Sequence, residues 1–131
     1  MIEKKDAMQI LVDACPSFRE SWSAHVGEHR NDLLYVAAGE FASHLLLLQE
    51  GQVISELRAV GKAIERLHVE GDSWVKEFAT IGVLEGIQNA WSHSAADLQS
   101  FVSYLGPESL RWWNGVNEFW QGKVPYVRAE G

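Results

Sequence analysis

Two histidines and a glutamate stand close together in the segment HVGEH, residues 25–29. The order of His25, Glu28 and His29 is that of the inverted zinc-peptidase motif H-x-x-E-H. A zinc site of this kind also needs a continuous helix, a third ligand and a coordination position for water. Gly27 weakens a helix at this point, and no second motif with ligand spacing follows. We therefore expect a chance match, with both histidines solvated near a helix C-terminus, where positive charge is favourable.

Other catalytic signatures are missing from the sequence. It contains no G-x-S-x-G, no phosphate-binding glycine loop and no dinucleotide fingerprint. Its single cysteine, Cys15, precedes Pro16 in an apolar segment, which favours a small buried hydrophobic residue over a nucleophile. These observations predict a protein that is not an enzyme and holds no metal or other cofactor.

The composition is that of one globular domain spanning residues 1–131. Hydrophobic residues make up 47% of the chain, and six tryptophans and five phenylalanines supply apolar surface for a core. The net charge of −7 argues against nucleic acid as a partner and favours a basic protein. The first residues, MIEKKDAM, contain no apolar run typical of a signal peptide, and the apolar stretch 41–49 is too short to span a bilayer. We expect a cytoplasmic protein.

Apolar residues recur with a helical period nearly everywhere, and the connections between the periodic segments are short. The sequence therefore predicts an all-α fold, a compact bundle of six or seven mostly antiparallel helices. The predicted helices cover about 3–15, 17–27, 33–49, 53–70, 72–91, 94–105 and 107–120, followed by an extended tail, 122–131, with a strand-like piece at 124–127.

Several residues are of the types that favour the N-terminus of a helix. Asp72 can cap the fifth helix, and Pro107 suits the first turn of the last one. Capping-box spacing at Ser17 with Glu20 and at Ser94 with Asp97 predicts two further starts. The apolar stripe of the third helix is Leu33, Ala37, Phe41, Leu45 and Leu48.

The fifth helix carries polar residues where a core is expected. On a wheel of 100° per residue, Glu85 falls between Trp74 and Phe78, and Asn89 falls beside Gly82. Neighbouring helices offer possible partners, which gives a predicted buried polar cluster of Glu40, His44, His68, Glu85 and Asn89. This cluster is either a metal or acid/base site, or an internal hydrogen-bonded network that fixes the register of the helices. A di-metal bundle site would normally show Glu-x-x-His on two helices, and the spacing here is Glu-x-x-x-His, once.

Acidic residues gather at the predicted turn between the fourth and fifth helices. Most such runs are solvated faces, but this one is the first choice for the surface that binds a partner. Its members are Glu65, Glu70, Asp72 and Glu77. Trp74 is the nearest aromatic anchor in the sequence, although the wheel turns it inward. In the last helix, the spacing of Trp113, Val116 and Trp120 predicts core packing, with Trp112 partly exposed.

Three stretches carry a resemblance to a known class of proteins: CPSF at 15–18, FATIGVLEGIQN at 78–89 and YLGPESLRWWNGVNEFW at 104–120. They resemble a family of small, acidic, all-helical bacterial proteins without an assigned enzyme activity, of the type of the immunity proteins of toxin systems. The resemblance implies a helical fold and neutralisation of a basic toxin domain through an acidic surface. It implies no catalytic residues.

We therefore expect a non-enzymatic binding protein, an immunity-type factor that occludes a cognate bacterial toxin. Two alternatives stay open. One is a helical-bundle enzyme or metal-binding protein that uses the internal Glu/His cluster. The other is a scaffold or adaptor protein.

Overall fold

The computed structural model describes residues 1–122, 125 and 127–129. If the uninterrupted run from Ser73 to Ser92 is counted once, the described residues form seven α-helical segments and no strand, which confirms the predicted all-α bundle. The elements are α1 Lys4–Ala14, the 3-10 turn η1 Pro16–Phe18, α2 Arg19–His29, α3 Leu34–Glu50, α4 Ile54–Glu70, α5 Ser73–Glu77, the π-helical segment η2 Phe78–Leu84, α6 Glu85–Ser92, α7 Leu98–Val102 and α8 Pro107–Trp120.

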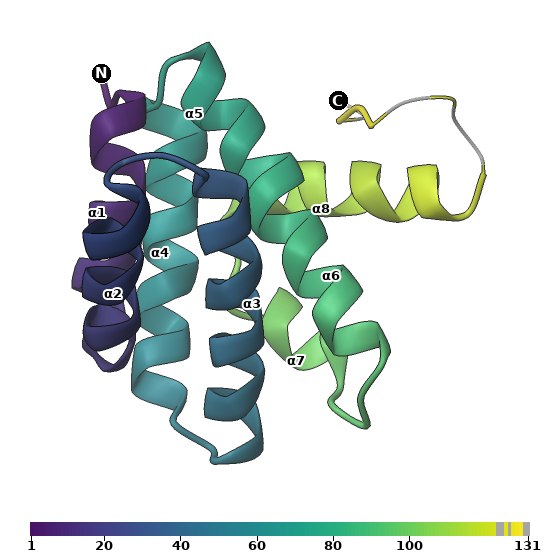
Figure 1. Cartoon of the computed structure of the whole chain (residues 1–131). Coiled ribbons are helices and arrows are strands. Elements are labelled where there is room, and N and C mark those ends of the chain that lie inside the picture. The colour runs from purple at the N-terminus through teal and green to yellow at the C-terminus, as the bar shows by residue number, and fades with distance from the viewer. Residues whose placement is uncertain (123–124, 126, 130–131) are drawn as a thin grey trace.

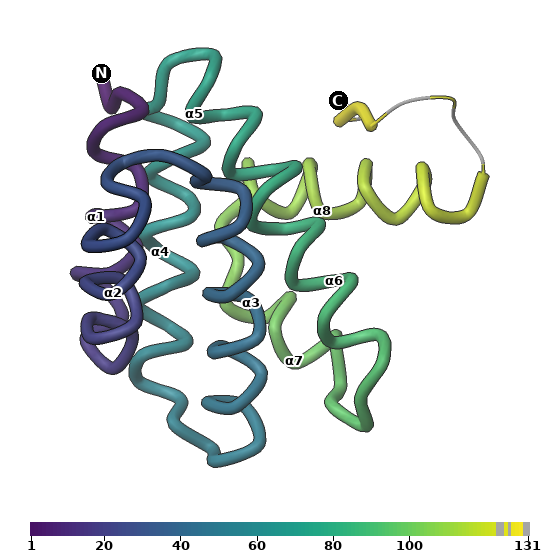
Figure 2. The backbone as a smooth tube through the Cα atoms, viewed as in Figure 1, coloured from purple at the N-terminus to yellow at the C-terminus, as the bar shows by residue number. Residues whose placement is uncertain are grey.

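The first four helices stand side by side, and α3 and α4 are antiparallel neighbours joined by a tight turn (Figure 1). By contrast, α8 runs crosswise to α3 and α4 and leaves the bundle, as the backbone tube shows (Figure 2). The N-terminal end of α8 packs against α4 and η2, so the helix is anchored at one end and projects at the other. None of the helices in the described part of the chain has the length and apolar character needed to cross a bilayer.

The chain near the N-terminus is tied to the turn between α4 and α5 by an isolated parallel bridge of Ile2 with Gly71. The Ile2 amide donates to the Glu70 carbonyl at 2.8 Å, and the Asp72 amide donates to the Ile2 carbonyl at 2.9 Å. Helical periodicity gives no sign of this bridge, because the two residues are almost 70 positions apart and neither lies within a helix.

The predicted apolar stripe of α3 is buried except at its first member. Leu33 is 48% exposed, because its φ of 51° places it in a left-handed turn before the helix begins at Leu34. In α8, Trp113 and Val116 are buried and Trp112 is half-buried, as predicted. The prediction for Trp120 was wrong: this side chain is 56% exposed, because the end of α8 projects from the bundle.

The long helical run from Ser73 to Ser92 changes its winding in the middle. Residues 78–84 are π-helical, with i→i+5 hydrogen bonds and therefore more residues per turn than the 3.6 of an α-helix. A helical wheel drawn at 100° per residue therefore assigns the residues after this segment to the wrong face of the helix. The buried polar residues of the run are consequently Thr80 and Gln88, and not Glu85 and Asn89.

Two helix starts follow the predicted chemistry and two do not. Asp72 caps α5 by accepting the Val75 amide at 2.9 Å, and Pro107 is the first residue of α8. The capping box at Ser94 was wrong, because Asp97 caps α7 while the Ser94 hydroxyl donates to the Trp91 carbonyl. The box at 17–20 was wrong as well, since α2 has no side-chain cap.

The predicted tail has neither helix nor strand at its described positions, 122, 125 and 127–129. Within the predicted strand-like piece, positions 124 and 126 lie outside the described residues. The Arg128 carbonyl packs against Gly115 of α8, where a Cβ atom would overlap it. The described part of this segment therefore returns along α8.

Two helical glycines allow a matched test of packing. A Cβ added to Gly61 of α4 would overlap the carbonyl of Tyr104, whereas one added to Gly39 of α3 meets nothing within 4 Å. We expect Gly61→Ala to lower the free energy of unfolding by about 1–3 kcal/mol. Gly39→Ala should raise it by up to about 1 kcal/mol, through helix propensity. Urea denaturation measures both, and equal midpoints would contradict the close approach at Gly61.

Candidate functional site

The HVGEH segment has a structural role. His25 is buried, its ring stacks on Trp22 at 5.5 Å, and its Nε2 lies 2.8 Å from the Asp32 carbonyl oxygen. The expectation that His25 is solvated was therefore wrong, since α2 continues through Gly27 and carries the ring into the bundle. Among the described residues, no three His, Cys, Asp or Glu side chains are grouped so that they could hold a metal.

The predicted buried polar cluster is not one cluster. His68 is buried and His44 and Glu85 are half-buried, but Glu40 and Asn89 are exposed. The π-helical segment η2 is the reason for part of this difference, because it rotates Glu85 and Asn89 away from the core. The alternative of a five-residue internal site therefore has no geometric basis in this fold.

His68 is instead the centre of a smaller buried network that joins three helices. Its Nδ1 lies 2.8 Å from the Ser109 hydroxyl of α8, and its Nε2 lies 3.0 Å from the Thr80 hydroxyl of η2. All three side chains are at most 3% exposed. Burial lowers the pKa of His68 to about 4, so the imidazole is neutral at pH 7. A neutral ring donates through one nitrogen and accepts through the other, and the two hydroxyls can satisfy both.

The residues of the predicted acidic end are mostly engaged within the protein. The Glu65 carboxylate accepts the backbone amides of Ser109 and Glu108 at the start of α8, at 2.9 and 3.2 Å. Burial acts to raise the pKa of Glu65, but these hydrogen bonds outweigh burial and hold the pKa below its ordinary value. Glu70 pairs with Arg66 at 3.1 Å, and Asp72 caps α5.

Glu77 is the remaining member of the predicted acidic end, and it is exposed. Trp74, the proposed anchor beside it, stacks on Phe78 at 5.1 Å and is covered by the Lys4 ammonium 5.0 Å from its ring. Trp74 is therefore half-buried and already packed against residues of the protein.

His44 forms a separate polar contact near the start of α2. Its Nε2 lies 2.7 Å from the hydroxyl of Ser17, whose backbone amide donates to Glu56 at 2.9 Å. Burial lowers the pKa of His44, and the nearby Glu56 partly opposes this effect. These bonds tie the η1 turn to α3 and α4, and they explain why the Ser17 hydroxyl does not cap α2.

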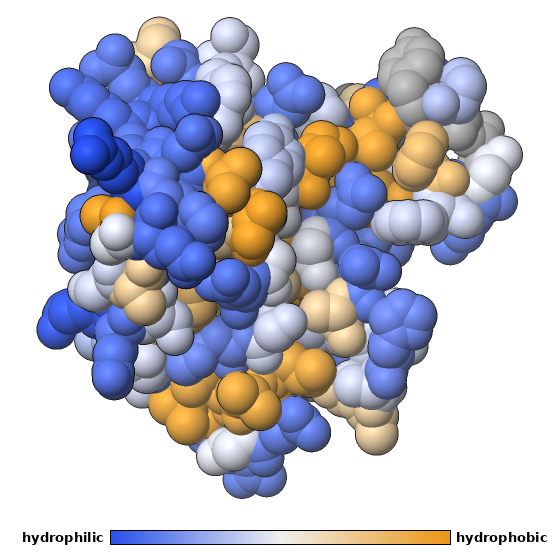
Figure 3. All heavy atoms as spheres, in the orientation of Figure 1, coloured by the Kyte–Doolittle hydropathy of each residue, from blue (hydrophilic) through white to orange (hydrophobic). Residues whose placement is uncertain are grey.

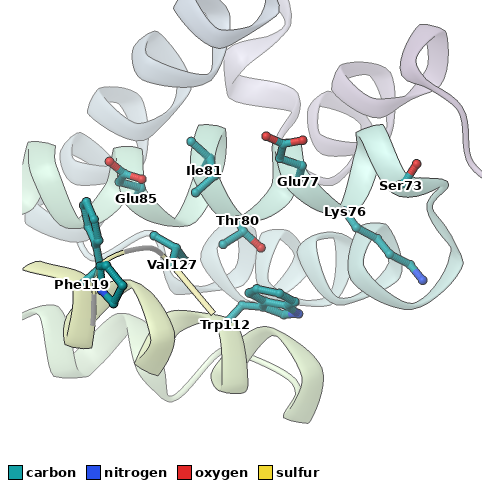
Figure 4. A pocket seen from close by; sticks show the side chains of 10 residues that line it. Ser73, Lys76, Glu77, Thr80, Ile81, Glu85, Trp112, Phe119 and Val127 are labelled. Atoms are coloured by element: carbon teal, nitrogen blue, oxygen red, sulfur yellow. The ribbon is translucent and has the colours of Figure 1, made fainter. Parts of the chain in front are cut away.

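An open groove of about 640 Å³ lies between the Ser73–Ser92 run and α8. Its volume is within the range of ligand pockets, roughly 300–1,000 Å³. Figure 4 shows Glu85 and Phe119 at one end, Lys76 and Ser73 at the other, and Trp112 beneath Thr80 between them. The groove is lined by Ser73, Lys76, Glu77, Thr80, Ile81, Glu85, Trp112, Phe119, Pro125 and Val127.

The groove continues into a second hollow of about 260 Å³ on the side of α3. Ile81 and Glu85 line both hollows, so the two form one surface, which we call the groove face. The second hollow is lined by Tyr35, Gly39, Ile81, Gly82, Glu85, Gly86, Asn89 and Trp120. In the space-filling view, apolar side chains gather where α8 meets the bundle (Figure 3).

Glu85 is the charged group shared by both hollows. Burial raises the pKa of its carboxyl above the ordinary value, and among the described residues it has neither a hydrogen bond nor an ion pair. We predicted that Glu85 would be mostly buried and hydrogen-bonded to a histidine or backbone donor. That prediction was wrong, because the carboxylate is half-buried and faces the groove.

The chain matches the family described as Domain of unknown function (DUF7674) over residues 8–121, and it belongs to that family. The match includes every helix from α2 to α8 and most of α1. No curated protein and no solved structure matched the chain.

Sequence reasoning missed Thr80, Ser109 and the walls of the groove. Thr80 and Ser109 are ordinary small polar residues in sequence, and His68 meets them 12 and 41 positions away. Among the groove residues, Trp112 was predicted to be partly exposed, and it is half-buried. For Phe119 the sequence carries no signal of its place in the groove, because its helical spacing is that of a core residue.

The buried imidazole of His68 generates a prediction about acid stability. Its pKa is about 4 in the folded protein and near 6.5 when unfolded, so the unfolded state binds more protons between these values. Stability should therefore fall as pH drops from 6.5 towards 4, and this one group accounts for about 2 kcal/mol between pH 7 and pH 4.5. In His68→Gln the loss of stability between pH 7 and pH 4.5 should be smaller by about 2 kcal/mol, although the variant is less stable at pH 7. Urea denaturation at both pH values measures it, with the exposed His93→Gln as the control. An unchanged pH slope in His68→Gln would contradict the assignment.

The carboxyl of Glu85 generates a prediction of opposite sign. Its pKa is raised in the folded state, so its contribution to stability is present below its unfolded pKa and is lost as pH rises through the folded pKa. Glu85→Gln should therefore be at least as stable as the parent above pH 6, and the difference should disappear at pH 4. Thermal denaturation of the two proteins measures this. A clear loss of stability in Glu85→Gln at pH 7 would mean that the carboxylate has an internal partner.

Proposed function

We propose that this protein is a non-enzymatic binding protein, an immunity-type factor that neutralises a toxin by seating part of a basic toxin domain on the groove face. The observation that carries the proposal is an open, largely apolar groove with a half-buried carboxylate that no described residue pairs. Groups held in this way, with a perturbed pKa in a concave site, are candidates for contact with another molecule.

Three further observations support a protein as the partner. The chain carries a net charge of −7, which favours encounter with a basic surface. Trp120 is 56% exposed at the edge of the groove face, and exposed tryptophans are frequent anchors of interfaces. The sequence also resembles small acidic immunity proteins. Such a factor would act in the cytoplasm, where it meets the toxin before harm is done.

The groove face is a better candidate than the acidic end named from the sequence. At that end, Glu65, Glu70 and Asp72 already have partners within the protein, so contact with a toxin would have to break those bonds. At the groove face, no described residue satisfies Glu85, and the hollow is open to solvent.

The test is rescue of growth. Genomic fragments of the source organism that arrest growth when expressed are collected first, and each is then co-expressed with this protein. We expect specific rescue from at least one fragment, loss of rescue with Trp120→Ala, and full rescue with Leu47→Ala. Leu47 is the matched control, because it is 65% exposed on α3 and does not line the groove face.

Rescue must be accompanied by a direct complex. The rescued fragment and the purified protein should co-elute in gel filtration, and Trp120→Ala should weaken the complex by about 10- to 100-fold. If no toxic fragment is rescued, the immunity function is wrong. If Trp120→Ala rescues as well as the parent, the toxin binds elsewhere on the surface.

A further inference from the structure

The position of Glu85 within the groove restricts what the groove can bind. Its carboxylate lies at the end of the groove that also holds Phe119, with Ile81 one turn away along the same helix (Figure 4). The carboxylate is thus flanked by the apolar side chains of Ile81 and Phe119, and burial is the cause that raises its pKa. Water hydrates it only in part, because the side chain is half-buried.

Three carboxylates near α8 and α4 differ from Glu85 in this respect. Glu65 accepts two backbone amides, and Glu108 and Glu70 each pair with an arginine. An ionised carboxylate without such partners in apolar surroundings is unfavourable. A cation that arrives from outside therefore gains more at Glu85 than at an exposed carboxylate, where water screens the attraction.

The two ends of the groove differ in charge, and this difference sets the direction of a bound molecule. At the end opposite Glu85, the lining residues Lys76 and Glu77 carry opposite charges, so that end has little net attraction for a cation. Trp112 lies between the two ends and offers an aromatic surface to a hydrocarbon chain. A ligand with one positive end and an apolar body fits with its charge at Glu85 and its body towards Trp112.

We propose that the groove binds a lysine or arginine side chain of the protein partner, with its charged end on the Glu85 carboxylate and its hydrocarbon stem along Ile81 and Phe119. This inference rests on the proposed function, because the partner carries the side chain. The adjoining hollow provides room for the partner's backbone, since Gly39 and Gly86 present no side chains there.

The experiment replaces the unidentified partner with a small probe of the same chemistry. The complete protein, labelled with 15N, is titrated with 4-phenylbutylammonium and, separately, with neutral 4-phenylbutan-1-ol and anionic 5-phenylpentanoate. Amide and indole resonances report where each probe binds. The variants are Glu85→Gln and, as a matched removal of charge, Glu20→Gln on α2, which lies on the other side of the bundle from α8 (Figure 1).

We expect the ammonium probe to shift the amides of Ile81 and Glu85 and the indole of Trp112. It should bind at least about tenfold more tightly than the alcohol, and the anion should bind most weakly. Glu85→Gln should reduce the affinity for the ammonium probe to that for the alcohol, whereas Glu20→Gln should leave it unchanged. Equal affinities for ammonium and alcohol, an unaffected Glu85→Gln variant, or no shift at the groove would each overturn the inference.

The same variants separate this inference from the proposed function. If the ammonium probe binds through Glu85 and no toxic fragment is rescued, the cation site stands and the immunity function fails. If a fragment is rescued equally by the parent and by Glu85→Gln, and the ammonium probe shows no preference, the immunity function stands and the cation site fails.

Discussion

The groove depends on the attachment of α8 to α4 at its first turn. There the Glu65 carboxylate accepts two amides of α8, and the buried imidazole of His68 bridges the hydroxyls of Ser109 and Thr80. These bonds hold the first turn of α8, and Trp113 and Val116 are buried in the middle of the helix. Only the end of α8 extends away from the bundle (Figure 1). A helix packed along its whole length would bury Phe119 and close the groove. The crosswise direction of α8 is therefore what creates a concave apolar surface in a protein of this size.

The π-helical segment is the second condition for this site. Its wider turn places Thr80 inward, where it meets His68, and leaves Ile81 and Glu85 facing the groove. Short π-helical segments inside α-helices are rare and occur frequently at functional sites. Here the segment allows one helix to serve both the internal network and the groove, because it shifts the register of the residues that follow.

The elements of the fold could be predicted from the sequence, but their register and crossing could not. The period of the apolar residues, together with Asp72 and Pro107 at the boundaries, was enough to locate the helices. Glu85 was assigned to the core because a wheel assumes constant winding, and nothing in FATIGVL indicates a wider turn. Trp120 was assigned to the core because periodicity shows that a face is apolar and not what covers it. The partners of His68 depend on tertiary packing, which local patterns do not contain.

The way in which each carboxylate is satisfied says more about function than the net charge does. Glu70 and Arg66 form an exposed pair four residues apart, which contributes little to stability. The Glu65 carboxylate accepts two amides at the start of α8, so it is unsuited to recognise a partner. Glu85 opposes folding slightly when it is ionised, since burial raises its pKa and no described residue compensates. The same helical run contributes the Thr80 hydroxyl to a satisfied network on its other face. That network can offset the unfavourable charge of Glu85, and this balance lets the folded protein keep a carboxylate ready for an external cation.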